Sequence, residues 1–345
     1  MPQKLYVQEI RQLPKVDLHR HLDCSLRWST VNEVAQNLGL KLPQLAPDRA
    51  KEFLITEKMD DLGSVLNKFL NTQKLLSSED ILERLAFEAC EDAFNDGVYL
   101  LELRYAPTFI ADGHPSLTFE NIHQALLRGI QKAEKTFPMA VGLICIIQRI
   151  KPYSEAENVV DFAIENKESF IALDLADNEV GFEPQVFAPL FNKAKKSGLH
   201  ITVHSGEAPH PDAGKWMLNS IETLGAERIG HGVQSIHHPE VLKILKEKNI
   251  HLEICPISNY LTQAFKTIAD NPIHKLMSSG ISVSINSDDP GVFATQLSDD
   301  YNALQSDLNF SVKEFTHCNQ MAFEHSFIPQ NKKSFLAPLY FPKGV

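Results

Sequence analysis

The sequence predicts an α/β fold, a (β/α)8 barrel of the TIM type with extra helices over the mouth at the carboxyl ends of its strands. Eight short apolar runs are spread along the 345 residues, and a helix-like amphipathic stretch lies between most neighbouring runs. This alternation is typical of a parallel sheet with helices outside it, and a barrel can use a chain of this length as one domain. We therefore expect a single domain over residues 1–345.

The predicted strands are short runs of mainly aliphatic residues bounded by turn or helix signals. Because parallel strands of a barrel are covered on both faces, such runs need not alternate with polar residues. The eight runs cover residues 16–21, 98–105, 140–148, 170–175, 200–204, 228–230, 251–254 and 282–285.

Several of the intervening helices carry end signals. Thr30 opens a sequence with the spacing of a capping box, and Gly39 is placed to end that helix. Residues 77–95 repeat apolar side chains at helical spacing and stop before Gly97, and residues 239–248 open with a proline. These signals predict three of the helices that lie between the strands in the sequence.

The segment 24–96 is too long for one crossover helix, so we expect it to add helices over the mouth. One of its stretches has an apolar face whose members recur at helical spacing. We favour core packing for this face over a role as a lid on the substrate. It consists of Leu62, Val65, Leu66, Phe69 and Leu70.

Composition narrows the class of protein. The net charge of −11 comes without a basic stripe, which argues against nucleic-acid binding. The first 15 residues contain no apolar signal segment, and no run approaches the roughly 18 apolar residues of a membrane span. Five scattered cysteines without a C-x-x-C pair argue against a disulfide scaffold. We expect a soluble cytoplasmic enzyme; its oligomeric state is not predicted.

Polar residues that can bind a metal fall where the predicted strands end. His19 and His21 are two apart on one strand, so both imidazoles face the same side. His204, His231 and Asp288 follow three other strands, and a barrel gathers its strand ends into one ring. Imidazoles with one carboxylate suit zinc, which lowers the pKa of a bound water towards about 7.

Each of these residues alone has an ordinary structural explanation. His204 alone is better explained as a core histidine, and Glu207 as a solvated loop acid. His231 lies between glycines, as in a tight turn, and Asp288-Asp289-Pro290 is typical of a helix N-cap. Their joint position at the ends of predicted barrel strands favours a shared site.

Motifs in this order and spacing resemble those of the adenosine/adenine deaminase family, over about residues 13–336. The resemblance implies a TIM-type barrel with one zinc ion per chain and hydrolytic removal of the purine 6-amino group. The motifs are His19-Arg20-His21-Leu22-Asp23, Glu102-Leu103-Arg104-Tyr105, Asp174-Leu175-Ala176, His204-Ser205-Gly206-Glu207, Gly230-His231-Gly232, Cys255-Pro256-Ile257-Ser258-Asn259 and Ser287-Asp288-Asp289-Pro290.

By matching position, the resemblance implies roles for the site residues. The metal ligands would be His19, His21, His204 and Asp288. The catalytic residues would be Glu207, protonated and donating to purine N1, His231, orienting the attacking water, and Asp288, accepting a bond from it. The substrate-binding residues would be His21, Asp23, Asp177 and Asp289. Asp289 would face purine N7, and because both are hydrogen-bond acceptors, either Asp289 or N7 must carry a proton.

Two positions depart from the family pattern, where glycine is usual: Cys24 and Asp177. At the second, a glycine lies against the purine, since a side chain occupies ligand space or needs an unfavourable backbone angle. Asp177 either points away and leaves adenosine acceptable, or lines the pocket. A lining carboxylate contacts a polar group absent from adenosine, or excludes the ordinary nucleoside.

Asp23 fits the nucleoside type of the family, in which this carboxylate contacts a ribose 5′-hydroxyl; the free-base type typically has Glu there. Asp23 would repel a 5′-phosphate, and Arg20 points to the opposite face of its strand. We therefore expect an adenine nucleoside as substrate, adenosine first, with modification at the 5′ or N6 position and free adenine left open.

Two rival functions are a different metal-dependent hydrolase and a non-catalytic purine-binding protein. The run 170–174 has no lysine to bridge a second metal, which favours a mononuclear site. His251 and Glu253 imitate half of the H-x-E and P-C-x-x-C signature of another class of zinc deaminase. No P-C-x-x-C follows, so we interpret His251 as a strand or core residue.

Overall fold

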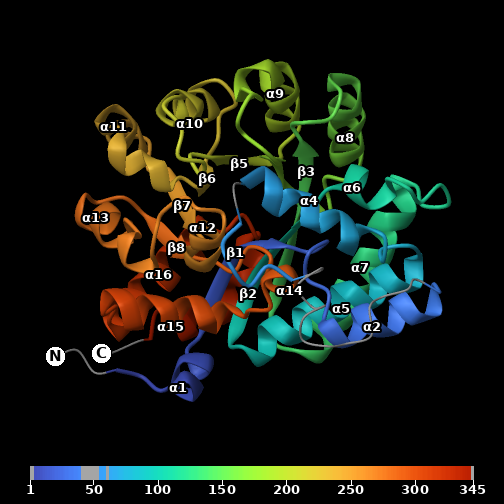
Figure 1. Cartoon of the computed structure of the whole chain (residues 1–345), viewed down its shortest axis with the longest axis horizontal. Coiled ribbons are helices and arrows are strands. Elements are labelled where there is room, and N and C mark those ends of the chain that lie inside the picture. Colours follow the sequence, from blue (N-terminus) through green and yellow to red (C-terminus); the bar gives the residue numbers. More distant parts are fainter. Residues whose placement is uncertain (1–3, 40–53, 60–61, 343–345) are drawn as a thin grey trace.

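The computed structural model describes residues 4–39, 54–59 and 62–342, which form the predicted (β/α)8 barrel (Figure 1). All eight strands pair in parallel in their order along the chain. The barrel closes where Arg20 bridges Asp288 after the last strand and the His21 amide donates to the Asp288 carbonyl. The predicted fold class is confirmed.

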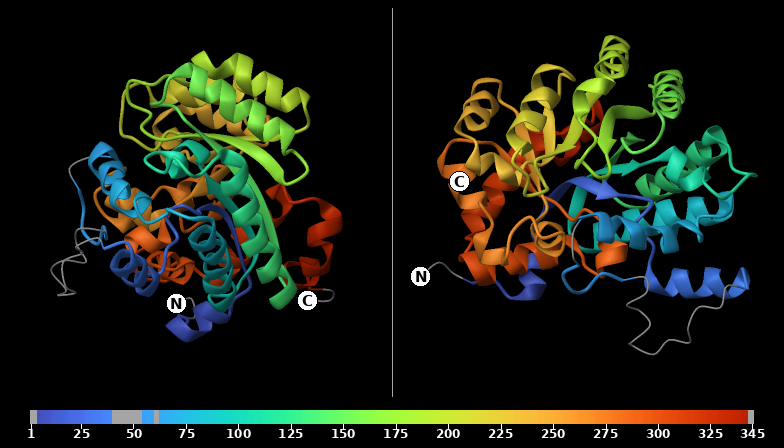
Figure 2. Two further views of the ribbon diagram at one scale, coloured as in Figure 1. Left: turned by 90° about the vertical axis from the view of Figure 1, so that its right-hand side faces the viewer. Right: turned by 45° about the horizontal axis from the view of Figure 1, so that its top comes forward.

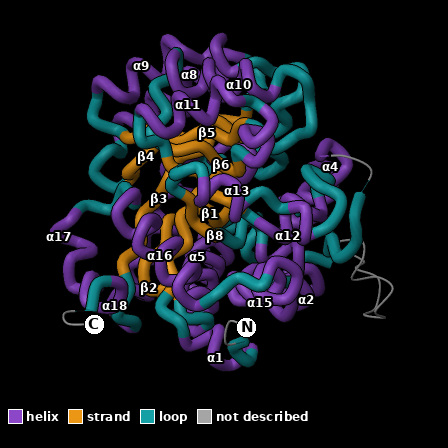
Figure 3. The backbone as a smooth tube through the Cα atoms, turned by 90° about the vertical axis from the view of Figure 1, so that its left-hand side faces the viewer, coloured by secondary structure: helices purple, strands orange, loops and turns teal. Residues whose placement is uncertain are grey.

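The strands begin and end within one residue of the predicted runs. They are almost entirely buried, as expected for strands covered on both faces. Figure 3 shows them at the centre of the molecule with helices around them. Their bounds are β1 Lys15–His21, β2 Val98–Tyr105, β3 Ala140–Gln148, β4 Phe170–Ala176, β5 His200–Ser205, β6 Arg228–His231, β7 His251–Ile254 and β8 Val283–Ile285.

One set of helices forms a layer outside the strands, which Figure 2 shows from two further sides. They pack apolar faces onto the strands and onto each other, so the main core lies between the two layers. These helices are α5 Glu79–Asn95, α7 Phe119–Thr136, α8 Tyr153–Glu165, α9 Ala188–Lys196, α10 Ala213–Glu222, α11 Pro239–Glu247, α13 Ile273–Ser278, α15 Leu297–Leu308 and α16 Val312–His325.

The other helices lie at the ends of the chain, in the loops and over the mouth. They are α1 Val7–Gln12, α2 Trp28–Asn37, α4 Leu62–Gln73, α6 Pro107–Ala111, η1 Pro184–Phe187, η2 Val233–His237, α12 Pro256–Leu261, η3 Ile268–Asp270, α14 Pro290–Phe293, α17 Gln330–Lys333, η4 Ser334–Leu336 and α18 Ala337–Tyr340. No helix of the described ranges is long and apolar enough to cross a membrane.

The helix ends agree with the sequence signals except at α2. Gly97 follows α5 with φ +85°, Gly39 follows α2 with φ +63°, and α11 begins at its proline. The predicted capping box at Thr30 is wrong, because α2 begins at Trp28 and places Thr30 in its first turn. The Thr30 hydroxyl instead donates to Glu88 Oε2 on α5 at 2.6 Å, so a tertiary contact takes the place of the cap.

Helix α4 lies over the mouth, in front of the strands in Figure 1. Core packing, the interpretation favoured from the sequence, holds for Val65, which is buried. It is wrong for Leu70, which is 51% exposed and lines a cavity together with Phe69. The helix packs one face on the barrel and presents its neighbouring face to the opening. The side chains of Leu62 and Leu66 lie outside the described residues.

Candidate active site

The barrel brings the predicted metal-binding residues together at the carboxyl ends of four strands. His19 and His21 come from the end of β1, His204 and His231 end β5 and β6, and Asp288 follows β8. The Nε2 atoms of His21 and His204 lie 3.2 Å apart. Asp288 Oδ1 lies 3.3 Å from Nε2 of His19 and 3.4 Å from Nε2 of His21. Nitrogen and oxygen donors thus surround one point.

The donor set fits a divalent metal ion. His19 Nε2 is buried and has no hydrogen-bond partner, although it lies in the middle of this group. Among the described residues, two groups can hold an ion with ligand atoms within 4.8 Å of one another: His19, His204, His231 and Asp288, and His21, Asp288 and Asp289. Asp288 belongs to both, and imidazole with carboxylate is a typical donor set for such an ion.

Two carboxylates fix the orientation of two of the histidines. Glu253 Oε2 lies 2.7 Å from His19 Nδ1, and Asp174 Oδ1 lies 3.1 Å from His204 Nδ1. Each carboxylate holds the proton on Nδ1 and leaves Nε2 with a lone pair towards the centre, as in the carboxylate–histidine pairs of metalloenzymes. Burial lowers the pKa of His204 to about 4, so the ring is neutral at pH 7.

Glu253 and Asp174 belong to a buried ionic network inside the barrel. Arg104 donates to both carboxylates, at 2.7 and 2.9 Å, and Arg228 donates to Glu253 at 2.7 Å. Burial opposes ionisation of Glu253, but the two guanidinium groups hold the pKa of this carboxyl well below its usual range. The sequence reasoning gave Glu253 no role. In the sequence, Glu253 is distinguished only by being a charged residue inside a short predicted strand.

His231 differs from the other histidines in its partner. The Asn259 side-chain amide donates to His231 Nδ1 at 3.0 Å, which places the proton of the neutral ring on Nε2. That nitrogen lies 3.6 Å from Glu207 Oε2 and 3.9 Å from Asp288 Oδ2. His231 therefore presents an N–H donor, rather than a lone pair, to the centre of the site.

Glu207 lies beside His231 and is almost fully buried. The Thr262 hydroxyl donates to its Oε1 at 2.8 Å. Asp289 lines the same space as Glu207, and burial together with the charge of Asp288 raises its pKa well above the usual range. Two acids, Glu207 and Asp289, thus line one space together with His21, His204 and His231.

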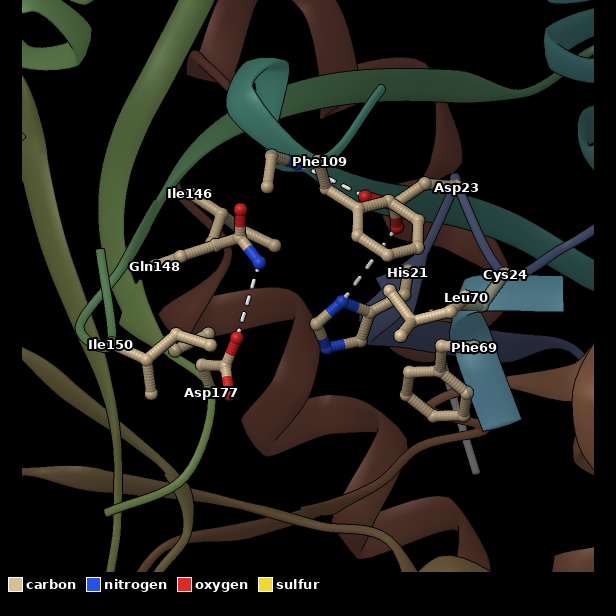
Figure 4. Close-up of a pocket in the computed structure, with 12 residues that line it drawn as sticks. His21, Asp23, Cys24, Phe69, Leu70, Phe109, Ile146, Gln148, Ile150 and Asp177 are labelled. Carbon is tan, nitrogen blue, oxygen red and sulfur yellow. Dashed lines mark hydrogen bonds and ion pairs between the residues drawn. The ribbon is translucent and has the colours of Figure 1, made fainter. Parts of the chain in front are cut away.

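An apolar cavity of about 190 Å³ leads away from the histidines towards the surface. Figure 4 shows the His21 ring facing Asp23, and Gln148 donating a hydrogen bond to Asp177. The cavity shares His21 and Asp177 with the space that holds Glu207. Neither space has a lysine or arginine among its described lining residues.

Asp23 and Cys24 lie in the wall of this cavity. Asp23 Oδ2 accepts from the Ala106 amide at 3.1 Å, and Oδ1 is buried without a hydrogen-bond partner, 4.0 Å from His21 Nδ1. Burial raises the pKa of Asp23 to about 7. Cys24 is buried, its thiol contacts Asp289, and burial raises the pKa of that thiol. All five cysteines are buried and form no disulfide.

Asp177 has a positive φ angle, which glycine adopts freely, and its side chain adds a carboxylate to the pocket. Its φ of +82° is left-handed, which an aspartate tolerates better than most residues. Gln148 Nε2 donates to Asp177 Oδ2 at 3.1 Å, and Thr108 orients Gln148 through a 2.8 Å bond to its Oε1. Of the two alternatives for Asp177, the structure shows the one in which it lines the pocket.

Arg20 points away from the site, as predicted from its place on the strand. Its Nε donates to Ser287 Oγ at 3.1 Å and lies 3.6 Å from Asp17 Oδ2. His251 is a buried strand residue whose Nδ1 contacts Ser282 Oγ at 2.8 Å, as interpreted from the sequence. Neither side chain belongs to the site.

Comparison with known proteins gives one consistent family. The family model for adenosine deaminase matches residues 14–339. The adenosine deaminase of Plasmodium knowlesi is 33% identical over 334 residues, which cover 96% of this chain and 91% of that protein.

Two solved structures with related activities have the same fold. Adenine deaminase from Arthrobacter aurescens superimposes with a TM-score of 0.87 at 25% identity, covering 95% of this chain and 98% of that one. The Arabidopsis N6-mAMP deaminase gives a TM-score of 0.84 at 28% identity, covering 96% and 99%. The fold, the histidine and aspartate cluster and these relatives agree, and the chain belongs to the adenosine deaminase family, a family of hydrolytic aminohydrolases.

Proposed function

We propose that this protein is a zinc-dependent deaminase that converts adenosine, or a closely related uncharged adenine nucleoside, to inosine or the corresponding hypoxanthine nucleoside and ammonia. One observation carries the proposal. Three histidine nitrogens and Asp288 surround a point that Glu207 and His231 border, in a chain of this family. Its relatives act on free base, nucleoside and N6-methylated nucleotide, so the family alone leaves the substrate open.

The metal would be held by His19, His21, His204 and Asp288. Nε2 of His19 and His204 is available because Glu253 and Asp174 occupy the other ring nitrogen. His231 is outside this set because its Nε2 carries the proton. A zinc ion in this position supplies a nucleophilic water at neutral pH.

The side chains around this group carry the proton transfers. Attack at purine C6 places electron density on N1, and Glu207, protonated when substrate binds, donates its proton there. Asp288 accepts a bond from the attacking water, and His231 Nε2–H donates to its oxygen. Asp289 faces N7, which is an acceptor, so one of the two must carry the proton. Asp288 then passes the proton of the attacking hydroxyl to the 6-amino group, which leaves C6 as ammonia while the oxygen stays on C6 as a carbonyl.

The cavity beyond His21 suits a sugar without a phosphate. Asp23 and Asp177 place two carboxyl groups along it, and the lining residues that the structure describes include no cation to neutralise a phosphate. Apart from His21 and Gln148, its remaining wall is mainly apolar. We assign Asp23 to the 5′-hydroxyl. Gln148 Nε2 and the Asn178 amide hold the Asp177 carboxylate at the wall, so we assign it to another sugar hydroxyl, rather than to a group absent from adenosine or to exclusion of the nucleoside. His21 would lie between the sugar and the metal.

The test is ammonia release by zinc-loaded protein, with metal-stripped protein as control and adenosine, N6-methyladenosine, adenine and AMP as substrates. We expect metal-dependent release with adenosine at the highest kcat/KM. A preference for AMP or adenine would refute the assignment of the sugar cavity. No release from any of the four would refute the proposed function.

A further inference from the structure

Glu179 lies on the loop between β4 and η1, close behind Glu207. Its side chain is 3% exposed. Its Oε2 accepts from the amide of Gly206 at 2.9 Å, and its Oε1 accepts from the amides of Glu207 at 2.9 Å and Ala208 at 2.7 Å. One carboxylate thus binds three consecutive main-chain donors at the point where β5 turns away from the barrel.

We propose that Glu179 is a positioning residue that holds the main chain of residues 206–208 so that the Glu207 carboxyl faces the substrate. This inference rests on the proposed function, in which Glu207 donates a proton to the purine. Glu179 itself does not line the pocket described above. Its action is through the peptide groups that carry Glu207.

Apart from the bonds to Glu179, residues 206–208 are constrained by the backbone of Gly206 and by contacts with Gln234. Gly206 has φ +69°, a left-handed angle that glycine adopts without strain, and a Cβ there would lie 2.4 Å from Met217 Sδ. Gln234 contacts the loop from the opposite side through the Gly206 and Glu207 carbonyls. Because the three amides are buried, the carboxylate is their hydrogen-bond partner in the structure.

Glu179 also joins the proton donor to the loop that contacts the sugar. It follows Asp177 by two residues, so the same turn carries the lining carboxylate and the acceptor of the Glu207 loop. Arg149 ties the underlying strand ends together, donating to the carbonyls of Leu175 at 2.8 Å and of His204 at 2.5 Å.

The main variant is Glu179→Gln, which keeps the size of the side chain. A glutamine offers one oxygen and turns an N–H₂ group towards at least one amide donor, so the three bonds cannot all form. We expect kcat to fall at least about tenfold, because small displacements of a catalytic group are costly. We expect metal content to stay unchanged and KM to change less than about threefold. Glu183→Gln on the same loop, whose partners are the exposed Lys215 and the neighbouring Gln185, is the control.

A double-mutant cycle separates positioning from a general structural defect. In a Glu207→Gln background, Glu179→Gln should lower the residual kcat less than about twofold, because the proton donor is already absent. Multiplied losses in the double variant, or normal kcat in the single one, would overturn the inference. A single variant that loses its metal would also overturn it.

Hydrogen exchange of the amides of residues 206–208 gives a readout that does not depend on turnover. We expect these amides to be protected in the unaltered protein and in Glu183→Gln, and to exchange at least about tenfold faster in Glu179→Gln. Unchanged protection would overturn the inference even if no substrate were deaminated. Lost protection with no deamination by the unaltered protein would refute the proposed function and leave the contact with the loop established.

Discussion

Replacing Asp177 by glycine tests how this chain differs from the usual family pattern. The change relieves a left-handed angle that costs a non-glycine residue about 1–2 kcal/mol. It also removes two hydrogen bonds, from Gln148 Nε2 and from the Asn178 amide, each contributing about 1 kcal/mol. The two effects nearly cancel, so we expect the free energy of unfolding to change by less than about 2 kcal/mol.

Activity should change more than stability does. A hydrogen bond from a sugar hydroxyl to a carboxylate contributes about 1.5–3 kcal/mol, and the half-buried Asp177 belongs at the lower end of that range. This corresponds to a loss of about tenfold in kcat/KM for adenosine. The inhibition constant of inosine should rise by a similar factor, whereas that of hypoxanthine, which has no sugar, should stay within about twofold.

Steady-state ammonia release and product inhibition measure both effects, and Asp177→Asn is the matched control because asparagine also tolerates the left-handed angle. We expect this control to lose less than the glycine variant does. A higher kcat/KM for adenosine in Asp177→Gly would show that the carboxylate obstructs the pocket, which refutes the proposed contact. Equal weakening of inosine and hypoxanthine would show that Asp177 acts on the base instead.

Four other outcomes are expected. Glu207→Gln should keep its zinc and lose at least about 100-fold in kcat, whereas His204→Ala should lose both the zinc and the turnover. Metal analysis together with ammonia release checks these two variants. Near-normal turnover in Glu207→Gln would contradict the role of Glu207. Glu253→Gln should weaken metal binding about 10- to 100-fold, measured by competition with a chelator. Chelator-stripped protein should melt at a lower temperature and recover with added zinc. Burial lowers the pKa of His123 from its usual 6.5 to about 4. The free energy of unfolding should therefore fall as the pH drops from about 6.5 to 4. Urea titrations over this pH range should show a shallower fall for His123→Gln than for the unaltered protein.

The sequence predicts the strands well because a barrel strand is an apolar run with a clear end, and this signal is local. The same rule places His19, His21, His204, His231 and Asp288, since each follows such a run. The geometry then follows from closure of the sheet, which no single segment encodes.

The errors have one physical origin, contacts made across the fold. Thr30 has the local chemistry of a helix cap, but Glu88 on another helix takes its hydroxyl. Leu70 continues an apolar stripe that is buried at Val65, yet it lies at the edge of the mouth. Glu179 has no local signal, because its three donors belong to a segment nearly thirty residues further along the chain.

Arg104 shows why the supporting residues of such a site are the hardest to find in a sequence. From β2, a strand that carries none of the proposed metal ligands, it donates both to Glu253, which contacts His19, and to Asp174, which contacts His204. The two acids are far apart in the chain and would repel each other if the guanidinium were not between them. Removing one partner of such a buried set leaves an uncompensated charge, which costs about 3–5 kcal/mol. The network therefore fixes the orientation of two histidines at once, and a metal site assembled from separate strands depends on this shared support.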